Sequence, residues 1–160
     1  MARSPGDAIV ALRSMRRRWA GLFAGLDEDE SADALAQRPG ADGVSALHHA
    51  STASAMLGFS DRDLEQILVH DDPELNDPSR RGIHAVARGV DQVIDELASH
   101  AERLADRADG ASAGDWSRKG SVPGRGDVDA LTVLWDAVDD AVSHLKAAEA
   151  TLREVRGRPV

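Results

Sequence analysis

The chain has 160 residues, a formal net charge of −9 and no cysteine. This length predicts one domain, residues 1–160, that is large enough to bury a hydrophobic core. The acidic balance argues against nucleic-acid binding, which needs a basic face. The lack of cysteine excludes disulfides, thiolate nucleophiles and cysteine-based metal sites.

The composition favours helices over sheets. Hydrophobic residues make up 42% of the chain but aromatic residues only 3%. Because sheets use aromatic and β-branched residues heavily, this aliphatic, alanine-rich composition predicts closely packed helices. No apolar stretch approaches the roughly 18 residues of a membrane span, and the N-terminus has no apolar run of signal length. We therefore expect an all-α, cytoplasmic protein with no membrane segment.

The first helix is predicted over about 5–26. Ser4 and Pro5 form a typical helix start, with a capping hydroxyl and a proline in the first turn. Apolar residues then recur at helical spacing from Ile9 to Leu26. Four arginines lie within this helix: Arg13, Arg16, Arg17 and Arg18. We interpret them as a solvated face, with an anionic ligand as the alternative.

The second and third helices are predicted over about 43–69 and 80–108. A short helical turn near 32–36 precedes the second helix, which is expected to bend or break near Gly58. The polar segment 70–81 contains two prolines and is long enough to run the length of a helix bundle. The second and third helices therefore need not be hairpin neighbours.

The last helix is predicted over about 127–156, after a glycine-rich loop that Trp116 is expected to hold against the bundle. Four amphipathic helices with no convincing strand give a four-helix bundle. In the last helix, Asp139 and Ser143 lie one turn apart, as do Asp140 and His144. Two side chains one turn apart can share a metal ion, so this helix could form one wall of a site.

Five segments, spread over most of the chain, carry a family resemblance. They are Leu35–Gly40, Gly43–Ala53, Ala101–Ala105, Gly114–Trp116 and Leu131–Leu134. Together they resemble the DinB-like family, which includes mycothiol- and bacillithiol-dependent transferases and mycothiol-dependent maleylpyruvate isomerases. The family typically has a Trp-Ser-x-Leu-Glu pattern in its second helix. Val44 stands here at the Trp position, and His48 stands at the Glu position.

The resemblance implies a four-helix bundle with up-down-down-up connectivity, a long connection between helices two and three, and often a homodimer. It also implies a divalent metal, zinc or nickel, held by three histidines. One histidine lies on helix two and two lie on the last helix as His-x-x-x-His. These positions fall on Thr52 together with Asp139 and Ser143 or, shifted by one residue, Asp140 and His144.

These residues depart from the three-histidine pattern. Threonine and serine hydroxyls are poor ligands for zinc or nickel. We therefore expect no cofactor and a pocket at the positions of Thr52, Asp139 and Ser143. Two alternatives stay open. A different His/Asp metal site could be built from a set on both helices: His48, His49, Asp140 and His144. Otherwise His144 pairs with Asp140 across one turn.

The other histidines carry no ligand spacing. They are His70, His84 and His100. We interpret them as structural or exposed.

Three functions follow from this sequence. The first is a DinB-like protein without the metal, which binds a small molecule or a partner and is not an enzyme. The second is a metal-dependent S-transferase or isomerase that uses a low-molecular-weight thiol, with the metal lowering the pKa of that thiol. The third is an assembly role as a homodimer. The ligand positions favour the first.

Overall fold

The computed structural model describes residues 3–24, 32–75 and 89–157. Its elements, in chain order, are α1 (Pro5–Arg13), α2 (Met15–Phe23), α3 (Ala32–Gln37), α4 (Ala46–Val69), α5 (Val90–Asp109), a 3-10 helix (Ala113–Ser117), β1 (Lys119–Val122), β2 (Gly126–Asp129) and α6 (Ala130–Arg156). The all-α class is confirmed. Within the described ranges, no helix is both long and apolar enough to cross a membrane.

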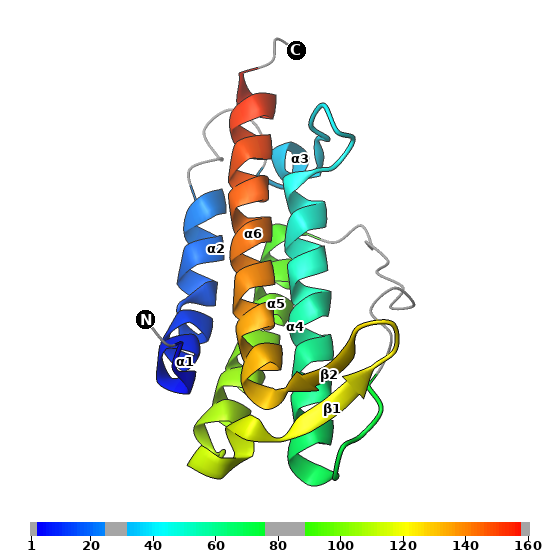
Figure 1. The fold of residues 1–160 in the computed structure, drawn as a ribbon. Helices are drawn as coiled ribbons and strands as arrows, with labels where there is room; N and C mark the ends of the chain where they lie inside the picture. Colours follow the sequence, from blue (N-terminus) through cyan, green and yellow to red (C-terminus); the bar gives the residue numbers. More distant parts are fainter. Residues whose placement is uncertain (1–2, 25–31, 76–88, 158–160) are drawn as a thin grey trace.

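The long helices lie side by side (Figure 1). α4 packs against both α5 and α6, while α1 packs against α5 and α6 from the other side. α4 and α5 run in the same direction, and α6 and the α1–α2 pair run in the opposite direction. The chain must therefore return from one end of the molecule to the other between Val69 and Val90. The predicted start of the third helix near residue 80 lies outside the described residues.

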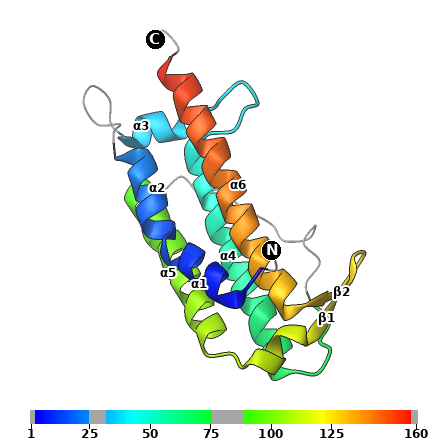
Figure 2. The same cartoon turned by 60° about the vertical axis from the view of Figure 1, so that its left-hand side comes forward.

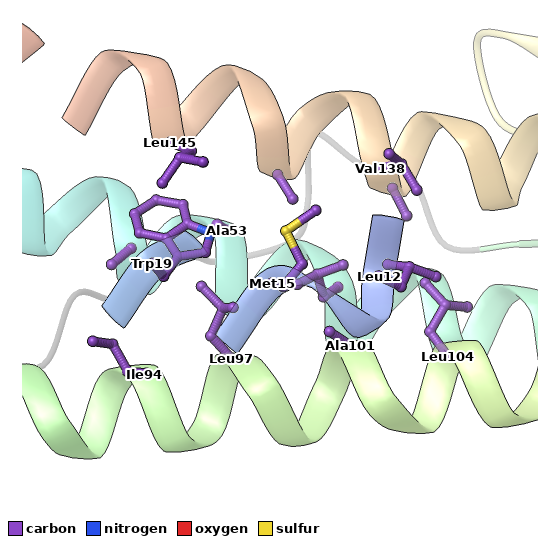
Figure 3. Packing of buried hydrophobic residues seen from close by; sticks show 14 of the residues in the cluster. Leu12, Met15, Trp19, Ala53, Ile94, Leu97, Ala101, Leu104, Val138 and Leu145 are labelled. Atoms are coloured by element: carbon purple, nitrogen blue, oxygen red, sulfur yellow. The ribbon is translucent and has the colours of Figure 1, made fainter. Parts of the chain in front are cut away.

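The core is aliphatic, as the composition predicts. Leu12, Met15 and Trp19 project from α1 and α2 between α5 and α6 (Figure 3). They meet a row of buried residues on α5: Ile94, Leu97, Ala101 and Leu104. Burying a side chain of this size contributes roughly 1.5–3 kcal/mol. The hydrophobic effect along these rows therefore holds the N-terminal helices on the bundle.

The sequence predicts one continuous first helix over about 5–26. The structure instead interrupts this helix at Ser14. The Ser14 hydroxyl donates to the Ala11 carbonyl at 2.6 Å, and the Ser14 amide is shared between the Val10 and Ala11 carbonyls, each at 3.2 Å. A serine that bonds back to the preceding turn competes with the regular helix ladder and often bends it. α1 and α2 therefore pack differently: α1 reaches both α5 and α6, whereas α2 follows α5.

The predicted break near Gly58 does not occur, because α4 is a single helix from Ala46 to Val69. A Cβ added at Gly58 would lie 3.1 Å from the ring of His100 on α5. That ring is held in place by a hydrogen bond from His100 Nδ1 to the Ser54 carbonyl at 2.7 Å. Gly58 therefore allows close approach of α4 and α5 and does not break the helix.

The predicted loop before the last helix contains a β-hairpin that the sequence analysis missed. β1 and β2 pair antiparallel, with Gly120 opposite Val128. Gly124 and Gly126 in and after the turn have positive φ angles of 80° and 89°, which glycine adopts readily. α6 then begins at Ala130 and not at residue 127, because Asp129 caps it by accepting from the Thr132 amide at 2.7 Å.

Three smaller predictions are confirmed. Trp116, in the 3-10 helix, is half-buried and packs against the core, so it does hold this segment on the bundle. α3 supplies the short helical turn expected near 32–36. Ser4 also caps α1 as predicted, by accepting from the Asp7 amide at 3.1 Å.

Two glycines should respond in opposite directions to substitution by alanine. Gly21 lies in α2 with nothing within 4 Å of an added Cβ. Gly21→Ala should therefore raise the free energy of unfolding by about 0.5–1 kcal/mol through helix propensity. At Gly120 an added Cβ would lie 3.1 Å from Ile67 and Leu75. Gly120→Ala should therefore lower the free energy of unfolding by about 1–3 kcal/mol through overpacking.

Urea denaturation of both variants beside the wild type measures these changes. A Gly21→Ala variant no more stable than the wild type would contradict the first expectation. A Gly120→Ala variant with wild-type stability would contradict the second.

Candidate functional site

The structure brings together one histidine of α4 and one of α6. His49 lies in the first turns of α4, after a cap in which Ser45 accepts from the His48 amide at 3.0 Å. His144 lies near the middle of α6. The two Nδ1 atoms are 3.2 Å apart, and the ring centroids are 5.4 Å apart with a tilt of 43°. One ring therefore donates its Nδ1–H to the bare Nδ1 of the other.

Both rings are half-buried, and this lowers the pKa of each. For His49, burial is the main cause, and repulsion from His144 adds to it. For His144, burial again dominates, while the charge of Asp140 acts in the opposite direction. Desolvation disfavours the charged imidazolium. The pair is therefore held toward the neutral state in which the Nδ1–Nδ1 hydrogen bond can form.

Asp140 lies one turn before His144 and is half-buried. Burial raises the pKa of Asp140, and the neighbouring charge of Asp136 raises it further. The charge of His144 has the opposite effect. Asp140 therefore acts on His144 through its charge, while the short contact made by the His144 ring is with His49 on α4.

The residues predicted from the resemblance differ in their exposure. Thr52 is half-buried on α4, whereas Asp139 and Ser143 are exposed on α6. Asp139 is engaged by the N-terminal segment: its carboxylate accepts from the Arg3 guanidinium at 2.6 and 3.1 Å. The same guanidinium lies 4.4 Å from the centre of the Trp135 ring. In the register of Asp140 and His144, one residue, His144, contacts α4 through His49.

Among the described residues, the other histidines do not complete a metal site. His48 is half-buried and influences His49 and His144 through its charge. His70 is exposed, and His100 is bonded to the Ser54 carbonyl, in line with the interpretation of both as exposed or structural. His84 lies outside the described residues. Across residues 3–24, 32–75 and 89–157, no group of three or more His, Cys, Asp or Glu side chains is placed to hold a metal ion.

A second feature was missed by the sequence analysis: a groove between α2 and α6 with a volume of about 500 Å³. We call it the α2–α6 groove. Its lining is Arg18, Gly21 and Leu22 from α2 and Leu145, Glu149, Leu152, Arg153 and Arg156 from α6. Arg18 had been singled out as part of a solvated face, with an anionic ligand as the alternative. The sequence did contain one indication of this groove: two leucines, Leu145 and Leu152, lie close to two arginines near the end of α6.

Comparisons with known proteins add no family assignment. No protein-family model matches the chain, and no curated protein matches it either. The DinB-like resemblance therefore rests on the sequence segments alone.

The histidine pair should make stability depend on pH. The folded-state pKa of both rings lies below the ordinary value of 6.5. The unfolded chain therefore binds protons more readily than the folded chain. The contribution of the pair is fully present above about pH 6.5 and is lost as the pH falls from there through the folded-state pKa.

Urea denaturation between pH 8 and pH 5 measures this effect in the wild type, His49→Gln, His144→Gln and the double variant. Each single variant should lose less stability on acidification than the wild type. The stability that the double variant loses on acidification should be at least as large as the sum of the two single changes predicts. The two changes do not add, because either one already removes the contact. A double variant with the wild-type pH dependence would contradict this assignment.

Proposed function

We propose that the chain is a DinB-like bundle that has lost the three-histidine metal site and acts as a small-molecule-binding or interaction module, not as an enzyme. Two features support the family. The helix directions, with α4 parallel to α5 and opposed to α6, agree with up-down-down-up connectivity. The segment between Val69 and Val90 agrees with the long connection that the family has there. We retain the expectations of a homodimer and of a cytoplasmic location as part of this proposal.

The observation that carries the proposal is the donor set between α4 and α6. Catalytic zinc sites use about three protein ligands with nitrogen, sulfur or carboxylate donors. Here the helix-two position is the hydroxyl of Thr52, and the carboxylate of Asp139 is bonded to Arg3. Two imidazoles remain, and they hydrogen-bond to each other. These residues do not fit a three-histidine site, so we derive no catalytic step through a metal.

A binding function also needs a place for a ligand. The α2–α6 groove provides one, and its lining includes neither His49 nor His144. Its volume of about 500 Å³ falls within the range of about 300–1,000 Å³ typical of ligand pockets. Loss of the metal site therefore does not remove the capacity to bind a small molecule.

One observation favours the alternative, a metal-dependent S-transferase or isomerase that uses a low-molecular-weight thiol. The two Nδ1 atoms are 3.2 Å apart. Two nitrogens bound to one tetrahedral zinc at 2.0–2.1 Å would be roughly 3.3 Å apart. The pair therefore has a spacing that a metal could bridge, with Asp140 as the nearest further donor along α6.

Metal content separates the two functions. Tag-free protein, purified without chelators and measured by mass spectrometry, should contain zinc and nickel well below one equivalent per chain. One equivalent that disappears in His144→Ala but stays in the exposed control His70→Ala would overturn the proposal in favour of the metal-dependent alternative.

Restoring the family's ligands tests the resemblance itself. In Thr52→His combined with Asp140→His, the native His144 supplies the third imidazole. This variant should gain one zinc equivalent by calorimetric titration, because Asp140 and His144 occupy the register that contacts α4. The matched variant with Thr52→His, Asp139→His and Ser143→His should bind more weakly, because its two α6 positions are exposed. If neither variant gained zinc, the assignment of Thr52 to the ligand position would be wrong.

A further inference from the structure

The α2–α6 groove exists because α2 diverges from α6. α1 packs against both α5 and α6, but after the interruption at Ser14 the chain follows α5. Figure 2 shows α2 lying along α5. The groove that results is lined by one face of each helix. The groove therefore lies where α2 follows α5 and not α6.

The floor of the groove is apolar. Leu22 is half-buried on α2, and Leu145 and Leu152 are buried on α6. Gly21 adds no side chain, and an added Cβ there would have nothing within 4 Å. The floor can therefore accept an apolar body in contact with three leucines, and burying that body would be favourable.

The rim of the groove is cationic. Among the described residues of the lining, Arg18, Arg153 and Arg156 accompany one carboxylate, that of Glu149, and these four residues sum to a charge of +2 in a chain whose formal net charge is −9. Glu149 pairs with Arg153 at 2.9 Å. Among the described residues, no ion pair is seen for Arg18 or Arg156. A guanidinium group binds carboxylate and phosphate groups through paired hydrogen bonds, so these two arginines select for an anion.

We propose that the α2–α6 groove binds a small amphiphilic carboxylate, with the head group on Arg18 and Arg156 and the aliphatic body over Leu22, Leu145 and Leu152. This inference rests on the proposed binding function and names the class of ligand. A neutral apolar molecule would leave the arginines without a partner. A second copy of this chain would bring the negative charge that the rim attracts. A folded surface, however, would not fill a groove of this size as a single aliphatic chain does.

Decanoate is the probe, and isothermal titration calorimetry with the full chain measures its Kd. The full chain is used because the acidic run Asp27–Glu30 follows α2 in the sequence. Any competition between these carboxylates and decanoate for the arginines is then included in the measured Kd. Decanol tests the apolar body alone and acetate tests the head group alone. Decanoate should bind with one site per chain, and more tightly than either control.

Three variants locate the site. Arg18→Gln and Arg156→Gln should each weaken decanoate binding about tenfold, the expected loss of one charge-assisted hydrogen-bonding partner. Arg17→Gln is the matched control, because Arg17 is an exposed arginine on the same helix that does not line the groove. Gly21→Leu should abolish binding by filling the floor, with folding verified by circular dichroism and urea denaturation.

Several outcomes would overturn the inference. Equal affinity for decanol and decanoate would show that the arginines do not select for the head group. An effect of Arg17→Gln as large as that of Arg18→Gln would show non-specific attraction. Unchanged binding in folded Gly21→Leu would place the ligand elsewhere.

Failure of this inference can be distinguished from failure of the proposed function. Stoichiometric metal would overturn the metal-free binding module and leave decanoate binding measurable at the groove. Absence of decanoate binding in metal-free protein would overturn only the ligand class. His49→Ala should leave the Kd for decanoate unchanged, because His49 does not line the groove.

Discussion

The packing of α4 against both α5 and α6 is the constraint on which the rest of the structure depends. Its inner face is made largely of small residues, among them Ala50, Ala53 and Ser54, and these let the two neighbouring helices approach closely. That proximity brings the His100 ring against Gly58 and the His144 ring against His49. Histidines widely separated in the sequence are therefore placed by helix packing and not by local motifs.

The helices could be predicted because each buries one apolar stripe, and the periodicity of a stripe can be seen in the sequence. The interruption at Ser14 could not be predicted, since a serine on a helix can either face solvent or bond back to the preceding turn. The hairpin was missed because its strands are short and glycine-rich, and only two inward valines, Val122 and Val128, resemble a strand pattern. Local signals were too few there to compete with a loop.

The site was harder to predict than the fold. One-turn spacing on α6 indicated that Asp140 and His144 share a face, but not which neighbouring helix that face meets. The axial alignment of α4 and α6 brings His49 against His144, and no single-helix pattern contains this alignment. Likewise, the α2–α6 groove arises from the angle between helices. Its arginines and leucines were visible in the sequence, but their meeting in one groove was not.

The hydroxyl of Ser14 has a consequence for how this protein can change over evolutionary time. One bond from this hydroxyl to the Ala11 carbonyl helps set the direction of α2 relative to α1. Ser14 itself is half-buried and lies outside both the hydrophobic core and the histidine pair. Replacement of Ser14 can therefore change the width of the α2–α6 groove without changing any residue of the core. Molecules of different size become accessible to one scaffold without the loss of stability that repacking of the core would bring.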